Sequence, residues 1–239
     1  MVERVRNNFS MLLRADCSLP LIQFATKSDI HKGLLREGWD PDRVFFKCND
    51  FASRDIWGDG NRLVCSIVRD LGIELDQLTK IRSAFPEHVP QLIAIAQRND
   101  REVGYFMEYL QGSTLDELYT MKQEGTPLMD KALGDLTSIA ISLHTCGIGH
   151  GDLNVTNIIR CTNGKIKLID PLRRYGETQE EIISDDINSL FFLLPHKMWE
   201  EYKKGTTTPL SRDSALVIDQ CATYVESAEI ETSLSRIPQ

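Results

Sequence analysis

Residues 150–159 read HGDLNVTNII, and residues 167–171 read KLIDP. Asp152 and Asn157 lie five positions apart on a polar segment that runs into two isoleucines. The Asn-Gly pair at 163–164 favours a tight hairpin turn. The alternation of polar and apolar residues at 165–169 predicts a half-buried strand that ends at Asp170. Two carboxylates and an amide are thereby expected near one another, which suits a cation such as Mg²⁺ and a proton acceptor.

This pattern resembles the catalytic core of the protein-kinase-like superfamily, in which H-x-D-x-x-x-x-N is followed by a hairpin and D-x-G. Pro171 departs from the second motif. His-Gly-Asp and Ile-Asp-Pro are similar to the compact branches that include aminoglycoside phosphotransferases, choline kinases and Rio-like kinases. The resemblance implies an α+β, bilobal protein-kinase-like fold, with a small antiparallel-sheet N-lobe at 1–109 and a short, mostly helical C-lobe at 110–239.

The resemblance also implies ATP and Mg²⁺ as cofactors, with Mg·ATP lying between the lobes. Asp152 would accept the proton of the acceptor hydroxyl or orient it, and Asn157 and Asp170 would bind the metal. Lys47, on a strand predicted at 43–48, would hold the α- and β-phosphates. A solubilising lysine on an edge strand is the alternative reading of Lys47.

Other parts of the N-lobe match the family pattern less closely. Glu74 is expected to pair with Lys47, with Asp70 as the alternative and an ordinary solvated helix face as a further one. No Gly-rich loop is present, so backbone N–H groups of Thr26 to Ser28 are expected to cover the phosphates. Phe45 should share a strand face with Lys47 and crowd or stack on the adenine.

The segment 103–112 resembles the hinge that joins the kinase lobes. The resemblance implies that Glu108 offers its carbonyl group to the adenine, and that Leu110 offers both its N–H and its carbonyl group. Met107 would lie at the back of the pocket. An ordinary buried strand end is the alternative interpretation of this segment.

Several further elements are predicted from local patterns. Strands are expected at 21–25, 31–35 and 89–96, and helices at 5–13, 63–85 (with a break near Gly72), 131–146 and 214–226, with a loop at 51–62. Thr114 and Glu117 form a predicted capping box. His144 is expected to be structural. A helix opening near residue 184 resembles the kinase helix whose aspartate, here Asp186, ties down the catalytic loop.

Composition sets limits on function. The chain has 239 residues, of which 41% are hydrophobic and 26% charged, as in ordinary globular proteins. The formal net charge of −8 argues against nucleic-acid binding through a basic surface. The sequence has six scattered cysteines, and it shows no signal peptide and no long apolar run. These features predict a cytoplasmic protein without a membrane span. A protein injected into another cell would have the same composition.

The predicted function is transfer of the γ-phosphate of Mg·ATP to a hydroxyl group. Asn154 stands where protein Ser/Thr kinases usually carry Lys, and only about fifteen residues separate Asp170 from Asp186. These features favour a sugar, glycan or other small molecule as acceptor, and no switching by activation-loop phosphorylation. A minimal protein Ser/Thr kinase of the Rio-like or bacterial effector type is the alternative. A non-catalytic nucleotide-binding pseudokinase is the second alternative.

Overall fold

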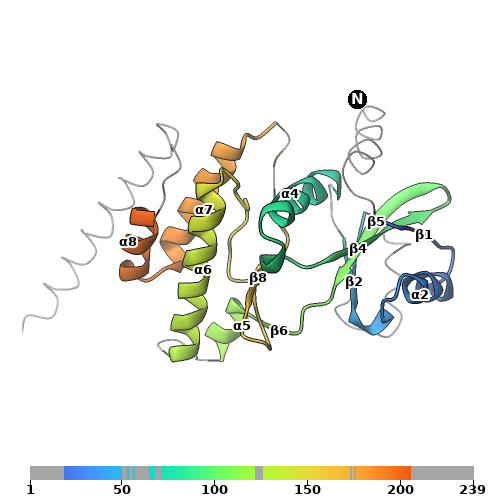
Figure 1. The fold of residues 1–239 in the computed structure, drawn as a ribbon, viewed down its shortest axis with the longest axis horizontal. Helices are drawn as coiled ribbons and strands as arrows, with labels where there is room; N and C mark the ends of the chain where they lie inside the picture. The colour runs from blue at the N-terminus through green and yellow to red at the C-terminus, as the bar shows by residue number, and fades with distance from the viewer. Residues whose placement is uncertain are drawn as a thin grey trace, which may run out of the picture. The chain divides into compact units, whose positions relative to one another are not determined.

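The computed structural model describes residues 19–49, 53, 56, 65–67, 71–121, 126–172, 174 and 176–205. The described residues divide between two compact units, Met1–Arg82 with Val89–Gln111 and Ser83–His88 with Gly112–Gln239. The fold class is α+β, as predicted, and Figure 1 shows the order of its elements. The helices predicted at 5–13 and 214–226, and most of the loop predicted at 51–62, lie outside the described residues.

The first unit contains a five-stranded sheet in the order β1-β4-β5-β2-β3. Its strands are β1 (Leu21–Gln23), β2 (Val44–Cys48), β3 (Cys65–Ile67), β4 (Leu92–Arg98) and β5 (Arg101–Glu108). The central pairs β2–β5 and β4–β5 are antiparallel, but β1 pairs with β4 and β3 pairs with β2 in parallel. The small sheet is therefore mixed, with parallel strands at both edges.

The helix α2 (Lys27–Arg36) occupies the place where a second strand was predicted at 31–35. Thr26 and Asp29 form a capping box that starts this helix, and Ile30 and Leu34 bury its apolar face. The short 3₁₀ helix η1 (Pro41–Arg43) then leads into β2. The strand prediction was wrong for two reasons. Ile30 and Leu34 lie four residues apart, as on one face of a helix, and the capping box of Thr26 and Asp29 stabilises the helix start.

The carboxylate of Asp29 accepts hydrogen bonds from the backbone N–H groups at the start of α2. Asp29 Oδ2 accepts hydrogen bonds from the Ala25 N–H at 3.1 Å and from the Thr26 N–H and hydroxyl at 2.8 Å each. These hydrogen bonds, led by that of the Thr26 side chain, lower the pKa of Asp29 below its usual value. The structure thus gives the Thr26 N–H a partner within the helix start, contrary to the phosphate-covering role predicted for it.

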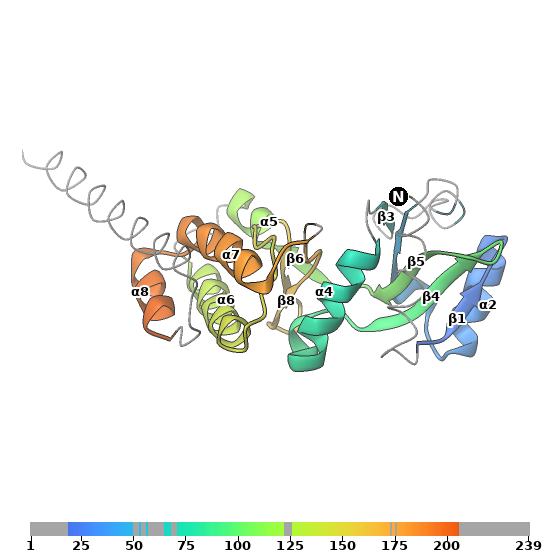
Figure 2. The same ribbon diagram turned by 90° about the horizontal axis from the view of Figure 1, so that it is seen from above.

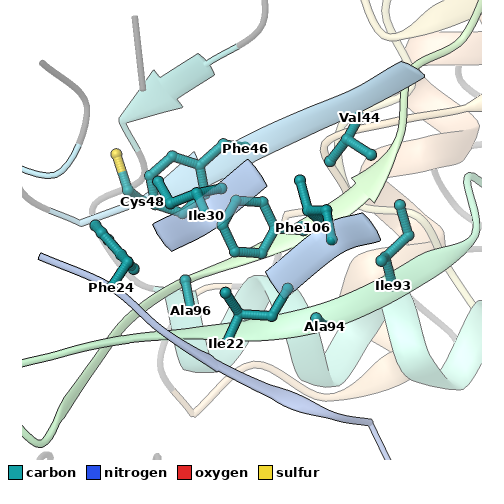
Figure 3. Packing of buried hydrophobic residues seen from close by; sticks show 11 residues of the cluster. Ile22, Phe24, Ile30, Val44, Phe46, Cys48, Ile93, Ala94, Ala96 and Phe106 are labelled. Atoms are coloured by element: carbon teal, nitrogen blue, oxygen red, sulfur yellow. The ribbon is translucent and has the colours of Figure 1, made fainter. Parts of the chain in front are cut away.

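The core of the first unit lies between α2 and one face of the sheet. Figure 3 shows side chains from α2, β1, β2, β4 and β5 packed together around Phe46, whose ring stacks on Phe106 with centroids 4.7 Å apart. Because side chains alternate along a strand, Lys47 points to the opposite face from Phe46. Lys47 is nevertheless 3% exposed, so the second face of the sheet is also covered.

The helix α4 (Leu71–Ala84) supplies the buried acid for that second face. The helix predicted at 63–85 is wrong in its first part, where Cys65–Ile67 forms the strand β3. The helix α4 begins at Leu71, close to the break predicted near Gly72. The parallel pairing of β3 with β2 links positions about twenty residues apart, which local periodicity does not register.

The second unit contains a three-stranded sheet and four α-helices among its described residues. Its elements are η2 (Pro86–His88), β6 (Gly112–Thr114), α5 (Leu115–Thr120), α6 (Pro127–Thr145), β7 (Ile158–Cys161), β8 (Ile166–Leu168), α7 (Gln179–Leu193) and α8 (His196–Gly205). The predicted hairpin is confirmed as β7–β8, and the predicted capping box of Thr114 and Glu117 starts α5. In both Figures 1 and 2, α6, α7 and α8 lie side by side.

The helix α7 begins earlier than predicted. Its N-cap is Thr178, which forms a capping box with Glu181, so Asp186 lies in the helix interior and does not cap its start. The hydrogen bonds from Thr178 lower the pKa of Glu181. None of the helices within the described ranges is both long and apolar enough to cross a membrane.

Candidate active site

The loop between α6 and β7 holds Asp152 by both of its carboxylate oxygens. The Asn157 amide donates to Asp152 Oδ2 at 2.7 Å and to the Asp152 carbonyl oxygen at 3.1 Å. The Asn154 amide donates to Asp152 Oδ1 at 2.8 Å. The spacing of Asp152 and Asn157 in the sequence therefore corresponds to direct contact in the structure.

Asp170 follows β8 on a backbone that is bonded to the same loop. The Ile169 N–H donates to the Asn157 carbonyl oxygen at 3.0 Å, and the Leu172 N–H donates to the His150 carbonyl oxygen at 3.0 Å. Asp170 itself has φ 57°, a left-handed conformation that aspartate adopts more readily than most residues. These bonds attach the backbone on both sides of Asp170 to the loop that carries Asp152 and Asn157.

Gly151 allows this close approach. Its φ is 85°, in the region that favours glycine, and a Cβ at this position would overlap the carbonyl oxygen of Leu172. Any residue with a side chain lacks room here while Leu172 keeps its place. The His-Gly-Asp sequence thus has a direct steric reason in this chain.

Asp186 holds the backbone of the loop that carries Asp152, as the resemblance implied. Its Oδ2 accepts from the His150 N–H at 2.5 Å, and its Oδ1 accepts from the Gly151 N–H at 2.7 Å. His144 Nε2 lies 3.0 Å from Asp186 Oδ2, and His144 Nδ1 lies 2.7 Å from the hydroxyl oxygen of Tyr202 on α8. Because a carboxylate only accepts, Nε2 carries the proton, and in the neutral ring Nδ1 accepts from Tyr202. His144 is fully buried and structural, as expected.

Tyr202→Phe should lower the free energy of unfolding by about 1–2 kcal/mol, because it leaves buried His144 Nδ1 without this donor. The ring remains, so its stacking on Trp199, with centroids 5.3 Å apart, is retained. Urea denaturation would measure the change. The control is Tyr109→Phe at a half-buried tyrosine, which should shift stability by less than about 0.5 kcal/mol. Equal effects of the two substitutions would contradict the role of the Tyr202 hydroxyl.

Burial lowers the pKa of His150 from its ordinary value of 6.5. The negative charges of Asp186, Asp152 and Asp170 and a hydrogen bond with the Ile169 backbone act in the opposite direction but are weaker. The imidazole is therefore neutral in the folded protein at a pH where it is protonated in the unfolded chain.

Folding stability should consequently fall as the pH drops below 6.5, since the unfolded state then binds a proton that the folded state does not. The loss continues until the pH reaches the lowered pKa of the folded state. Chemical denaturation of wild type and His150→Gln between about pH 7 and pH 5 would measure this contribution. The variant should show a shallower decrease in stability, and an unchanged pH dependence would contradict the assignment.

The first unit places Lys47 and Glu74 in a buried ion pair. Lys47 Nζ lies 3.2 Å from Glu74 Oε1, and the two side chains are 4% and 11% exposed. The Tyr105 hydroxyl donates to the same carboxylate oxygen at 2.6 Å. The alternative interpretations, a solvated edge lysine and a solvated helix face, do not fit side chains this deeply buried. The functional roles of both residues stay predictions.

The residues predicted for adenine binding lie on or after β5. Phe45 is half-buried and lies opposite Met107 in the strand pairing, and Met107 is 5% exposed. Glu108 is the last residue of β5, and its N–H donates to the Gln91 carbonyl oxygen at 2.8 Å. Leu110 follows in irregular backbone. The structure leaves the predicted adenine contacts of these residues untested.

Sequence reasoning missed the side-chain partners of several residues, among them Glu74, His144 and Asp152, the last of which is bonded by Asn154. Tyr105 lies opposite Lys47 in the β2–β5 pairing, and this could have been inferred had the register of the two strands been assigned. Tyr202 contacts His144 across 58 positions of sequence, and nothing local indicates that contact.

The donor set of the second unit fits a hard cation. The Asn157 nitrogen faces Asp152, so the amide oxygen is turned away from that carboxylate. Backbone hydrogen bonds attach the chain on both sides of Asp170 to the same loop. Within the part of the chain that the structure describes, no group of three or more His, Cys, Asp or Glu side chains could hold a metal ion. Mg²⁺ fits such a sparse set, because it is usually bound by one or two carboxylates together with water and substrate phosphates.

Comparison with known proteins gives one informative similarity. No family model matches the chain. A mitogen-activated protein kinase kinase of Aspergillus fumigatus is 27% identical over 159 residues, which are 62% of this chain and 29% of that protein. The solved structure of the bifunctional kinase-methyltransferase WbdD has a TM-score of 0.38 and 19% identity, with 62% of this chain and 39% of that chain covered. The chain thus spans less than a third of the length of the kinase that it matches. The sequence similarity to that kinase agrees with the resemblance to the protein-kinase-like superfamily and selects no branch of it.

Proposed function

We propose that the chain binds Mg·ATP and transfers the γ-phosphate to a hydroxyl group. The observation that carries this proposal is the hydrogen bond of the Asn157 amide to the carboxylate of Asp152, in a loop held by the buried Asp186. The bond fixes a proton acceptor beside a potential metal ligand. Sequence similarity to a protein kinase supports the same class of reaction.

Each residue has a specific role in the proposal. Asp152 accepts the proton of the acceptor hydroxyl or orients it, and Asn157 and Asp170 hold Mg²⁺ through their oxygens. Lys47, oriented by Glu74, holds the phosphates. Bound Mg²⁺ would neutralise charge that develops on the phosphate oxygens during transfer. Met107, Glu108 and Leu110 are the proposed adenine contacts.

We favour a sugar, glycan or other small alcohol as the acceptor, in line with the compact branches of the superfamily. Two features support this choice: Asn154 in place of the lysine of protein Ser/Thr kinases, and the short segment between Asp170 and Asp186. A protein acceptor is the second candidate, and the similarity to a mitogen-activated protein kinase kinase favours it. With γ-labelled ATP, label on low-mass material supports the first candidate and label on protein bands supports the second.

Calorimetric titration of Mg·ATP into the full chain tests the nucleotide site. Binding should depend on Mg²⁺, and Asp170→Ala should weaken it by about tenfold or more, because the variant lacks one of the few metal ligands. The matched control is Asp135→Ala, on the same unit, where the aspartate pairs with Lys131 on the exposed face of α6. The proposal fails if wild type does not bind Mg·ATP, or if Asp170→Ala binds it as wild type does.

A further inference from the structure

The side chain of Asn154 makes two kinds of hydrogen bond at once. Its Oδ1 accepts from the Thr156 N–H at 2.9 Å and from the Thr156 hydroxyl at 2.5 Å. Its Nδ2 donates to Asp152 Oδ1 at 2.8 Å. Asn154 thus connects the turn of the loop to the proposed catalytic carboxylate.

The orientation of this amide follows from its neighbours. A backbone N–H can only donate, so the end of the amide that faces the Thr156 N–H must be the oxygen. The nitrogen must then face Asp152, whose carboxylate accepts. The backbone of Asn154 is held as well. Its carbonyl oxygen accepts from the Asn157 N–H at 3.0 Å, and its N–H donates to the Asp152 carbonyl oxygen at 3.0 Å.

We infer that Asn154 is a positioning residue that fixes the orientation of the Asp152 carboxylate for phosphoryl transfer; this inference rests on the proposed function. With Asn157 on Oδ2 and Asn154 on Oδ1, rotation of the Asp152 side chain about its Cα–Cβ bond or its Cβ–Cγ bond would cost a hydrogen bond from an amide donor. The lone pairs of the Asp152 carboxylate that would receive the proton of the acceptor hydroxyl are thereby held in one direction. Proton acceptance depends on such alignment, because small misplacements of reacting groups reduce rates strongly.

A role confined to the turn would need only the oxygen of Asn154. The β7–β8 hairpin shows this simpler case, where Asn163 Oδ1 accepts from the Lys165 N–H at 3.0 Å. An aspartate serves equally well at such a position, since its side chain makes the same bond to the backbone. What distinguishes Asn154 is its nitrogen, which an aspartate would replace with an oxygen facing the Asp152 carboxylate.

Two variants of Asn154 separate positioning from turn formation. Asn154→Asp keeps an acceptor for both Thr156 donors and loses the donor to Asp152, whereas Asn154→Ala loses both. Asn163→Asp is the control, because it makes the same chemical change at a turn remote in sequence from Asp152. Each full-length protein is compared with wild type for ADP release from Mg·ATP and for Mg·ATP affinity.

Both Asn154 variants should lower the maximal rate by about tenfold or more while the KM for Mg·ATP changes by less than about twofold. Asn154→Asp should be at least as impaired as Asn154→Ala, and Asn163→Asp should match wild type. Wild-type activity in Asn154→Asp would overturn the inference, because the turn alone would then be sufficient.

A second measurement does not depend on turnover. In aspartate-labelled protein, three-bond couplings to the Asp152 carboxyl carbon report its side-chain rotamer by nuclear magnetic resonance. Wild type should show one rotamer, and both Asn154 variants should show averaged couplings. A single unchanged rotamer in both variants would refute the positioning role. Failure of wild type to bind Mg·ATP would refute the proposed function. The couplings would still show whether Asn154 fixes the Asp152 side chain, so the two failures can be told apart.

Discussion

Asp152→Ala is expected to lower phosphoryl transfer by about 10²–10⁴-fold with the fold retained, since a positioned proton acceptor contributes on this scale. Alanine is preferable to asparagine at this position. An asparagine would set an NH₂ group against the amide nitrogen of Asn154 or Asn157, and this donor–donor contact would disturb the loop for an unrelated reason.

The measurement is ADP release from Mg·ATP in the presence of a panel of sugars and alcohols, with calorimetric Mg·ATP affinity measured in parallel. Affinity should stay within about threefold of wild type, because Asp152 is proposed to act on the acceptor rather than on the nucleotide. Asp135→Ala again provides the control. Undiminished transfer in Asp152→Ala would exclude this residue as the proton acceptor. Binding of Mg·ATP by wild type without any transfer would favour the pseudokinase alternative.

Lys47→Met is expected to lower the free energy of unfolding by about 3–5 kcal/mol, because it leaves Glu74 as a buried carboxylate without its cation. The double variant Lys47→Met with Glu74→Gln should regain most of that loss. The neutral amide removes the buried charge, and its oxygen can still accept from the Tyr105 hydroxyl. Mg·ATP binding should remain lost in both variants, since the proposed phosphate-binding cation is absent from both.

Lys80→Met provides the matched control on α4. Lys80 pairs with Asp76 at 2.8 Å, but the two side chains are 40% and 22% exposed, so the substitution should change stability by less than about 1 kcal/mol. Urea denaturation gives the stability and calorimetry gives the affinity. Recovery of Mg·ATP binding in the double variant would show that Lys47 serves folding alone.

The β7–β8 hairpin and the ion pair of Lys47 with Glu74 could be predicted because their signals are local or follow a known spacing. Asn-Gly set the β7–β8 turn, and the spacing of Asp152 to Asn157 matched the contact between them. Lys47 and Glu74 were identified as a pair from the family pattern, and their burial supports the pairing. Local chemistry is sufficient where one turn or one strand decides the geometry.

The wrong predictions have two physical causes. In two places a capping box starts a helix where the sequence pattern indicated something else, and in one place a strand forms through pairing with a distant segment. Thr26 with Asp29 and Thr178 with Glu181 both start helices, yet a strand was predicted at 31–35 and the start of α7 was placed too late. β3 was predicted as helical because its partner β2 lies elsewhere in the sequence. The orientation of the Asn154 side-chain amide could not be predicted, because it depends on the positions of Asp152 and Thr156 in the folded loop.

The absent side chain of Gly151 has a consequence for control of the protein. Leu172 lies against Gly151, and its N–H is bonded to the His150 carbonyl group. Displacement of the chain just after Asp170 would therefore cost the hydrogen bond between Leu172 and the loop that carries Asp152. The segment just after Asp170 is therefore poorly suited to act as a switch. We expect no regulation of activity through displacement of this segment.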